Sequence, residues 1–454
     1  MNPLLALFLL VLLPELPHAG QAPQSAPQQL SPDPEARARE VVRWMAAGQF
    51  EKVEAIYDSA VAGALPAGKL AESWQTLIAQ VGAFRSVTAA KVKTVQGLQV
   101  VTLTTAFEGA VLDGNIVFHP DGKLAGLHFG PHVADVDWTA PGYATPSSFH
   151  ESGVTVSSGH WQLPGTLTLP NGDGPFPAVV LVHGSGPNDA DETIGPNKPF
   201  KDLAWGLVSR GIAVLRYVKR TRQYGANSTD DASKFTVNEE TVDDARAAIA
   251  LAAANPRIDP KRVFLLGHSL GAFLAPRIAL GEPRIAGLVL LAGSTRPLDQ
   301  IIVEQVRYIV TQEHVPAEMA QKKIQEAEGW ARDMDRSDLK PADQVEMFGT
   351  KIPGAYFLDL RSYDSAATAA KLTLPMLILQ GERDYQVSMA DFDGWKKALA
   401  PRENVSLKSY PALNHLFVAG TGPSVPKEYD RPGHVAEETI ADVAAWIGGT
   451  KPKQ

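Results

Sequence analysis

At 454 residues, the chain is long enough for two globular domains, and 44% hydrophobic against 20% charged side chains is an ordinary composition for a folded protein. Its 42 basic and 50 acidic residues give a net charge of −8, which argues against nucleic acid or an anionic membrane as a partner. The absence of cysteine excludes a disulfide, a thiolate nucleophile and a lipid-acceptor cysteine behind a signal peptide.

The first residues are unlike the rest of the chain. An almost purely apolar run, Leu4–Leu13, is followed by prolines and by the small-residue stretch Ala19-Gly20-Gln21-Ala22. The run is too short to span a bilayer and has the proportions of a secretory signal, although no Lys or Arg precedes it. We therefore predict a signal peptide over residues 1–22, a disordered leader over residues 23–34, and an exported protein, periplasmic or secreted, with no membrane attachment after cleavage. The alternative is a cytosolic protein with an apolar start.

Residues 35–135 are predicted to form a small α+β domain. Apolar residues recur at helical spacing from Glu35 to Tyr57, and a further helix is predicted over Lys69–Val81. The period then changes to two, which predicts four strands at Val87–Val95, Leu98–Phe107, Gly109–His119 and Leu124–Phe129. Helices followed by such strands indicate an antiparallel sheet with helices packed on it. Three histidines are interpreted as strand-end residues rather than metal ligands: His119, His128 and His132.

A linker over residues 136–150 leads to a larger domain, residues 151–450. Two strand-like segments, Gly153–Ser157 and Gly165–Leu169, precede an alternation of buried strands and helices. Strands are predicted at Ala178–Val182, Ile212–Tyr217, Val263–Leu266, Leu288–Ala292, Met376–Gln380 and Val405–Tyr410, and helices at Pro199–Arg210, Val237–Ala254, Ala272–Leu280, Phe392–Ala400 and Val435–Ile447. The alternation indicates an α/β domain with a mostly parallel, doubly wound sheet. A charge-rich helical segment, about residues 297–355, is predicted to be a lid over the active site.

The pentapeptide Gly267-His268-Ser269-Leu270-Gly271 joins a predicted strand to a predicted helix. This strand–turn–helix setting predicts a nucleophile elbow, in which Ser269 has a strained backbone and its hydroxyl stands clear of the sheet. The flanking glycines let the strand and the helix approach on either side of the serine. Pro276 lies inside the predicted helix and is expected to kink it or to remove one backbone hydrogen bond.

A serine hydroxyl is a poor nucleophile unless a base takes its proton. Two histidines lie beyond the later strands: His415, in the loop after the strand that ends at Tyr410, and His434, at the start of the last helix. Because a doubly wound sheet places its site beyond the carboxyl ends of its strands, we predict His415 as the base. Asp384, in the loop after the Met376–Gln380 strand, is predicted to orient it, with Glu382 as the second candidate. The chain order Ser…Asp…His is the one expected of this architecture.

An oxyanion needs two preorganised N–H donors. We predict the amides of Leu270, which follows the nucleophile, and Ser185, in the loop His183-Gly184-Ser185-Gly186, with Gly186 as an alternative to Ser185. His183 is interpreted as a residue that braces this loop. A phosphate-binding loop is the rival interpretation, but the G-x-x-x-x-G-K-[ST] and G-x-G-x-x-G spacings are absent. A group of acidic residues that follows would also repel a phosphate, and we interpret it as stabilising the loop: Asp189, Asp191 and Glu192.

Three stretches resemble bacterial α/β-hydrolase carboxylesterases: His183-Gly184-Ser185-Gly186-Pro187-Asn188-Asp189, Gly195-Pro196-Asn197-Lys198-Pro199-Phe200 and Gly267-His268-Ser269-Leu270-Gly271. Members of that branch often carry a small N-terminal α+β domain. The resemblance covers most of the chain after the signal, and it implies an α/β-hydrolase fold, a small-molecule carboxylic ester with a short acyl chain as substrate, and neither a cofactor nor a metal. It carries the triad over onto Ser269, Asp384 and His415.

One position departs from the family. The pattern Tyr-Asp-Lys-Arg stands here as Tyr217-Val218-Lys219-Arg220, so we expect Lys219 or Arg220 to lack a carboxylate partner. Two functional alternatives remain beside the esterase. A peptidase or thioesterase would use the same triad, and a binding or sensory protein would use a degenerate hydrolase scaffold with the small domain as its reader.

Overall fold

The computed structural model describes residues 33–66, 68–95, 97–132, 138–347, 350–400 and 402–451. They form two compact units, one comprising the described residues up to 132 and the other those from 138 onward. The predicted signal peptide and almost all of the predicted leader lie outside the described residues, so export stays a prediction. In the described part of the chain, no helix combines the length and the apolar character that a membrane span requires.

The first unit is an α+β domain, as predicted. Its helices are α1 (Pro34–Ala46), α2 (Phe50–Glu54), α3 (Ser59–Ala64) and α4 (Lys69–Val81), and its strands are β1 (Phe84–Val95), β2 (Leu98–Phe107), β3 (Val111–Phe118) and β4 (Leu124–Pro131). The strands form one antiparallel sheet in the order β1-β2-β3-β4. Helix α3 has no apolar period in the sequence; the Asp58 carboxylate caps it by accepting from the Val61 amide at 2.7 Å.

The core of this unit is formed by alternate side chains of its strands, which point to the face of the sheet that the helices cover. Val101 and Leu103 of β2 are buried, and they pack with the apolar face of α1 and with Trp74 of α4. Two of its histidines each lie against a single carboxylate: His119 Nε2 is 2.9 Å from Asp58, and His132 Nδ1 is 2.8 Å from Asp113. Among the described residues of the whole chain, no group of three or more His, Cys, Asp or Glu side chains is placed to hold a metal ion.

The second unit is built on an eight-stranded sheet. Its strands are β5 (Phe149–Ser158), β6 (Trp161–Pro170), β7 (Phe176–Val182), β8 (Ala213–Tyr217), β9 (Ile258–His268), β10 (Ile285–Leu291), β13 (Met376–Gly381) and β14 (Val405–Tyr410), in the order β14-β13-β10-β9-β7-β8-β6-β5. The pairs from β14 to β8 are parallel, and only the β8–β6 and β6–β5 pairs are antiparallel. The mostly parallel sheet predicted from the sequence is confirmed.

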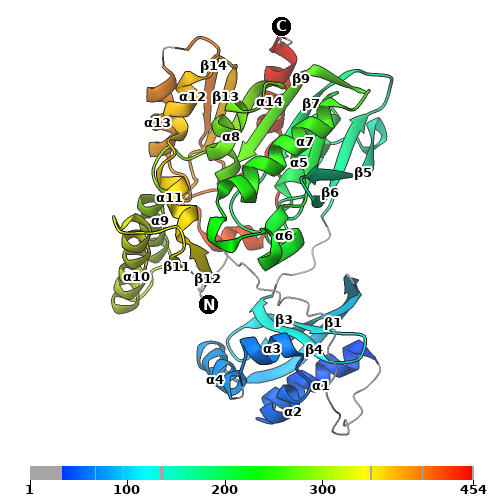
Figure 1. Cartoon of the computed structure of the whole chain (residues 1–454), viewed down its shortest axis with the longest axis vertical. Coiled ribbons are helices and arrows are strands. Elements are labelled where there is room, and N and C mark those ends of the chain that lie inside the picture. The colour runs from blue at the N-terminus through cyan, green and yellow to red at the C-terminus, as the bar shows by residue number, and fades with distance from the viewer. Residues whose placement is uncertain are drawn as a thin grey trace. The chain divides into compact units, whose positions relative to one another are not determined.

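Helices cover both faces of this sheet (Figure 1). Along β7, Val180 and Val182 face one core cluster while Val179 and Leu181 face the other, because successive side chains point to opposite faces. The first cluster contains residues of α7 (Asp243–Ala253), α8 (Leu270–Leu280) and α13 (Met389–Leu399), and the second contains residues of α5 (Pro199–Val208) and α14 (Glu437–Gly449). Short helices α6 (Arg220–Tyr224) and α12 (Ser365–Lys371) complete the domain.

The helix predicted over Val237–Ala254 is not uniform. It begins with a π-helical turn over Asn238–Val242, and regular α7 follows from Asp243. A π turn shifts the side chains that follow it relative to an ideal helix, and it is often found at functional sites. Here the turn carries Glu240, whose carboxylate is buried.

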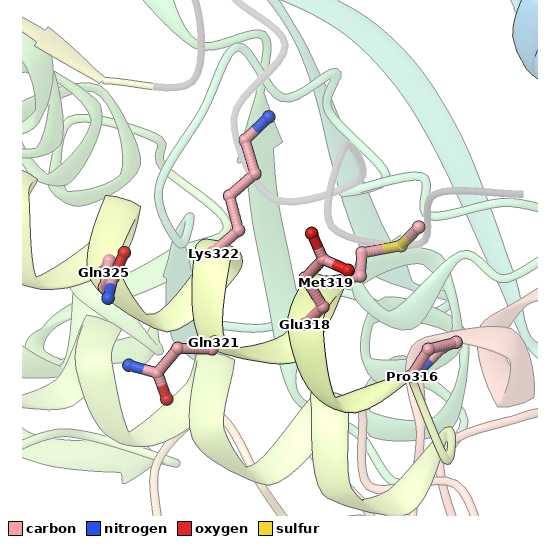
Figure 2. Close-up of a pocket in the computed structure, with 6 residues that line it drawn as sticks. All are labelled: Pro316, Glu318, Met319, Gln321, Lys322 and Gln325. Atoms are coloured by element: carbon pink, nitrogen blue, oxygen red, sulfur yellow. The ribbon is translucent and has the colours of Figure 1, made fainter.

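The segment predicted as a helical insertion contains α9 (Leu298–Gln312) and α10 (Ala317–Asp335), which lie side by side (Figure 1). It also contains an antiparallel pair, β11 (Gln344–Met347) and β12 (Thr350–Pro353), and is followed by α11 (Gly354–Arg361). A pocket lies along the start of α10 (Figure 2). Its lining residues come from α10 and the residue before it, and none belongs to the predicted site: Pro316, Glu318, Met319, Gln321, Lys322 and Gln325.

Candidate active site

Ser269 occupies the sharp turn between β9 and α8. Its backbone has φ 53° and ψ −117°, a left-handed conformation that is uncommon for a residue with a side chain. A Cβ on Gly267 would collide with the Gly271 backbone, and a Cβ on Gly271 would collide with the Val182 carbonyl oxygen of β7. The close approach expected of a nucleophile elbow is therefore present. Helix α8 runs on through Pro276, which is buried inside it.

His415 and Asp384 come together beyond the carboxyl ends of β14 and β13. The His415 Nδ1 atom lies 2.7 Å from Asp384 Oδ2, and both side chains are buried. The Asp384 carboxylate also accepts hydrogen bonds from the Gln380 side chain at 3.0 Å and from the backbone amides of Gln386 at 2.8 Å and Val387 at 3.0 Å. Because an ionised carboxylate only accepts, Nδ1 carries the proton in this pair, and His415 Nε2 is left as the basic atom.

The alternative residues have other partners. Glu382 accepts from the Ser409 hydroxyl at 2.8 Å, and Arg383 pairs with Glu428 at 2.7 Å rather than with Asp384. His434 Nδ1 lies 3.0 Å from Asp202. Among the described residues, none of these groups forms a hydrogen bond or ion pair with His415 or Ser269, so the geometry favours Asp384 and His415.

The elbow, the loop after β7 and the loop after β14 converge. The space beside Gly184 is bounded by Ser269, because a Cβ placed on this glycine would lie 3.2 Å from the Ser269 Cβ. The residue before Ser269 contacts the loop after β14, because His268 Nε2 lies 3.0 Å from the His415 carbonyl oxygen. Within the described part of the chain, the Ser269 hydroxyl is free of hydrogen bonds to side chains. Bonds between a nucleophile and its base often form fully only when substrate is bound.

Two backbone amides are placed to act as oxyanion donors. Leu270 is the first residue of α8, so its N–H has no partner within the helix. In the loop after β7, the Gly184 amide donates to Glu192 Oε1 at 2.6 Å, whereas the Ser185 amide has no hydrogen bond within the described residues. The Asn188 side chain holds the same loop through the carbonyl oxygens of Gly184 at 3.2 Å and Ser185 at 3.1 Å.

His183 is buried beneath this loop and braces it. Its Nε2 atom lies 3.0 Å from the Asp189 carbonyl oxygen, and its ring packs against Phe200 and Tyr217 at centroid distances of 5.0 and 5.2 Å. Burial lowers the pKa of His183 to about 4, since a charged imidazole would lose its hydration there. The ring is therefore neutral at pH 7.

Glu192 has a larger part than the sequence suggested. Asp189 and Asp191 stabilise the loop as predicted: the first accepts from the Thr193 amide at 3.0 Å, and the second pairs with Arg216 at 2.9 Å. Glu192, however, is buried with a positive φ of 51°, and its Oε2 lies 2.8 Å from His268 Nδ1. One carboxylate thus ties the loop after β7, through Gly184, to the residue before Ser269. The sequence holds no signal of this pair, because the two residues are far apart in the chain.

The surroundings of the His268 ring favour its protonated, positively charged form. Burial by itself would lower the pKa of His268, but the Glu192 carboxylate outweighs it and holds that pKa above 6.5. Burial would likewise raise the pKa of Glu192, yet the adjacent His268 keeps it below its usual value. Both ring nitrogens of His268 face acceptors, Glu192 on one side and the His415 carbonyl on the other. This pair connects all three loops of the site.

Replacing Glu192 by Gln is expected to lower the free energy of unfolding by about 3 kcal/mol at pH 5.5, because the buried ion pair between Glu192 and His268 is lost. The pKa of His268 is raised in the folded state. Its contribution to the free energy of unfolding is therefore complete below pH 6.5 and is lost as the pH rises through the pKa of the folded state. Glu192 contributes until the pH falls through its own lowered pKa. The difference between the two proteins should therefore shrink between pH 5.5 and pH 9 in urea unfolding.

Asp191→Asn is the matched control, since Asp191 lies in the same loop and pairs with Arg216 and Lys198 instead of a histidine. The amount by which Asp191→Asn lowers the free energy of unfolding should be the same at pH 5.5 and pH 9. An effect of Glu192→Gln that does not change over this range would mean that His268 does not titrate against Glu192.

Lys219 and Arg220 both have carboxylate partners, so the expectation based on Val218 was wrong. Lys219 Nζ lies 2.6 Å from Glu240, and Arg220 forms an ion pair with Asp244. These carboxylates come from the π turn and from α7, at least 21 residues further along the chain. Burial raises the pKa of Asp244 despite its pairing with Arg220.

The inserted segment is fastened to the loop that carries Asp384. Gln305 of α9 donates to the Gln386 carbonyl at 2.8 Å, and the Tyr308 ring stacks on Tyr385 at 5.4 Å. Tyr385, Leu416 and Tyr429 form a small apolar cluster with residues of α9. Because Tyr385 and Leu416 directly follow Asp384 and His415 in the chain, this cluster lies next to the His415–Asp384 pair.

An elbow serine on a mostly parallel sheet, with a His–Asp pair beyond the carboxyl ends of later strands, defines the class of serine hydrolases with the α/β-hydrolase fold. Comparison with known proteins agrees. Residues 175–420 match the family described as serine aminopeptidase, S33, and residues 38–127 match a domain family of unknown function, DUF3887. Esterase EstD of Thermotoga maritima is 38% identical over 407 residues, which are 89% of this chain and 93% of EstD.

Among solved structures, Est1E from Butyrivibrio proteoclasticus is 16% identical with a TM-score of 0.42, covering 65% of this chain and 99% of Est1E. An esterase from Pyrobaculum calidifontis is 18% identical with a TM-score of 0.42, covering 66% of this chain and 85% of that one. On the sequence matches, the chain belongs to the α/β-hydrolase carboxylesterases that carry a small N-terminal α+β domain.

Proposed function

We propose that the chain hydrolyses carboxylic esters with short acyl chains through an acyl-enzyme formed on Ser269. The observation that carries the proposal is the His415–Asp384 pair, whose Nδ1 and Oδ2 atoms are 2.7 Å apart. This pair lies beyond the carboxyl ends of the strands, at the end of the sheet where the turn with Ser269 is also found. The match to EstD, an esterase by name, supports an ester as the substrate.

In the first half-reaction, the Ser269 hydroxyl oxygen attacks the ester carbonyl carbon while His415 Nε2 takes its proton. Asp384 holds the ring through Nδ1–H and stabilises the imidazolium. The negative charge that develops on the carbonyl oxygen is stabilised by the amides of Leu270 and Ser185. As the tetrahedral intermediate collapses, the C–O bond to the alcohol breaks, and the imidazolium returns its proton to the leaving oxygen.

In the second half-reaction, water replaces the alcohol. His415 Nε2 takes a proton from this water as its oxygen attacks the acyl carbon, and the same two amides stabilise the second oxyanion. The bond to Ser269 then breaks, its oxygen regains the proton, and the carboxylic acid leaves. No other group is needed for the protons and electrons to balance.

A short acyl chain is supported by the cluster beside the catalytic loops. Tyr385, Leu416 and Tyr429 are buried and pack with Ile309 of α9. Side chains packed in this way fill the space on the α9 side of His415, so they restrict the room for a long alkyl chain. The inserted segment acts in this proposal as a lid, held to the Asp384 loop by Gln305.

A peptidase is the second candidate, because the family match covering residues 175–420 is described as a serine aminopeptidase. The test is a series of p-nitrophenyl esters from acetyl to dodecanoyl, measured beside aminoacyl p-nitroanilides and an acyl thioester, with Ser269→Ala as the blank. We expect kcat/KM to be highest for the acetyl to butyryl esters and to fall by at least about tenfold at the longest chains, a change typical of a few misfitted methylenes.

Turnover of the anilides at a rate equal to or above that of the esters would assign the peptidase function instead. A rate that rises steadily with chain length would contradict the short-acyl pocket. Absence of turnover with every substrate would favour the binding-protein alternative.

A further inference from the structure

Lys219 is a fully buried lysine in the loop between β8 and α6. Lysine is almost never buried without partners, because its ammonium group loses its hydration. Here the Nζ atom donates to the Gly184 carbonyl oxygen at 2.8 Å and to Glu240 Oε1 at 2.6 Å. The mechanism above gives neither Lys219 nor Glu240 a role.

The bond from Lys219 to the Gly184 carbonyl oxygen links this lysine to a proposed oxyanion donor. The Gly184 carbonyl and the Ser185 N–H belong to one peptide unit, in which resonance couples the oxygen and the nitrogen. A cation on the carbonyl oxygen draws electron density through the C–N bond, so the N–H becomes more positive and a stronger donor. Ser185 N–H is one of the two amides placed to bind the oxyanion.

The lysine itself is held in place by the lid side of the domain. Glu240 Oε2 accepts from the Tyr356 hydroxyl of α11 at 2.6 Å, and the Tyr356 ring stacks on Phe235. Burial, followed by the charge of Glu240, raises the pKa of Tyr356 well above its usual value, so the hydroxyl stays protonated and able to donate. Glu240 is therefore anchored on one oxygen by Tyr356 and presents the other to Lys219.

The Gly184 residue is thus fixed from both sides. Its N–H donates to Glu192 at 2.6 Å, and its carbonyl accepts from Lys219 at 2.8 Å and from the Asn188 side chain at 3.2 Å. The backbone amide of Lys219 in turn donates to the Asn188 carbonyl at 3.1 Å. These bonds leave the following peptide little freedom to turn its N–H away from the nucleophile.

We propose that Lys219 is a positioning residue that orients and polarises the Gly184–Ser185 peptide, strengthening the Ser185 amide as an oxyanion donor, and that Glu240 and Tyr356 hold it there. The inference deepens the proposed function and rests on it. It predicts that Lys219 acts on the rate of the chemical steps, where the oxyanion exists, and hardly on substrate binding.

The experiment compares two pairs of substitutions on the full chain. Lys219→Met combined with Glu240→Gln removes both buried charges without leaving either one unpaired. The control is Arg220→Met combined with Asp244→Asn, which removes the neighbouring buried ion pair. Arg220 bonds to Ser158 and lies over Trp161, and its side chain makes no hydrogen bond to the loop after β7 among the described residues.

For Lys219→Met/Glu240→Gln we expect kcat for p-nitrophenyl acetate to fall about tenfold with KM changed less than about twofold, since a whole oxyanion donor contributes roughly 100- to 1,000-fold. The control should keep kcat within about twofold even if its melting temperature falls. The infrared carbonyl stretch of an acyl-enzyme formed with a slowly deacylating ester should move to higher frequency in the first pair only, because a weaker donor polarises the acyl carbonyl less.

Unchanged kcat and carbonyl frequency in the first pair would overturn the inference, as would an equal loss of kcat in the control. If the first pair does not fold, Tyr356→Phe replaces it, because this substitution only removes the hydrogen bond that holds Glu240. It should lower kcat about two- to threefold and move the acyl carbonyl stretch to higher frequency. No change in either quantity would overturn the inference. Wild type and Ser269→Ala are measured alongside. Failure of wild type to turn over any ester contradicts the proposed function, whereas an active, Ser269-dependent wild type with an unaffected Lys219 pair contradicts this inference alone.

Discussion

Ser269→Ala is expected to lower kcat for short-chain ester hydrolysis by about five to six orders of magnitude, because the loss of a serine nucleophile removes the covalent route entirely. The residual rate would come from the oxyanion donors and from substrate binding. Alanine should fit the elbow, since the Ser269 side chain makes no hydrogen bond within the described residues. The positive φ of 53° is already imposed on a residue with a Cβ, so the strain should be unchanged and the fold should persist.

The measurement is steady-state turnover of p-nitrophenyl acetate, together with the mass of the protein after incubation with a fluorophosphonate. Wild type should gain one phosphonyl group on the peptide that contains Ser269, and the variant should gain none. Ser209→Ala is the control, because the Ser209 hydroxyl bonds to the Trp205 carbonyl at the end of α5, outside the site. Labelling of a different serine with retained turnover would refute the elbow assignment.

Asp384→Asn is expected to lower kcat by about four orders of magnitude while leaving the fold intact. The asparagine oxygen can still accept from the amides of Gln386 and Val387, which now bond to Asp384 Oδ1. Its NH2 group, however, would face His415 Nδ1, so the ring would place its proton on Nε2 and could not act as a base. The NH2 group would also oppose the Gln380 amide, which now donates to Asp384 Oδ2 at 3.0 Å, so we expect a modest loss of stability in a fold that persists, while the basic atom is lost.

Glu382→Gln is the matched control, since it removes a carboxylate from the same loop two residues away. Glu382 is bonded by the Ser409 hydroxyl and not by His415. We expect this variant to keep kcat within about twofold of wild type, as is usual for surface substitutions. The reverse outcome, a large loss for Glu382→Gln and a small one for Asp384→Asn, would move the acid of the triad to Glu382.

Much of the site could be predicted because its signals are local. The pattern Gly267-His268-Ser269-Leu270-Gly271 specifies a tight turn within five residues, and both glycines stand where a Cβ would strike backbone. The buried strands are likewise recognisable as short apolar runs, and β2, β14 and α4 begin and end at the predicted residues. The short helices α3, α6, α11 and α12 were missed because none of them is long enough to show a period.

The choice between candidate residues needed the folded chain. In the sequence, Asp384 and its second candidate Glu382 follow the same strand, and the structure shows that Asp384 faces His415 whereas Glu382 faces Ser409. The expectation that Val218 left a cation unpartnered failed for the same reason. The partner of Lys219 is Glu240, 21 residues away in a π turn that no local pattern announces.

The sequence by itself determined the α/β class and the elbow, since each depends on periodicity or on contacts between near neighbours in the chain. The tertiary structure decided which charged groups surround them. The Glu192–His268–His415 connection and the Lys219–Glu240–Tyr356 connection join residues as far as 147 and 116 positions apart. Buried ion pairs form where desolvation is offset by a partner of opposite charge, and the partner is set by the packing of whole elements rather than by any stretch of sequence.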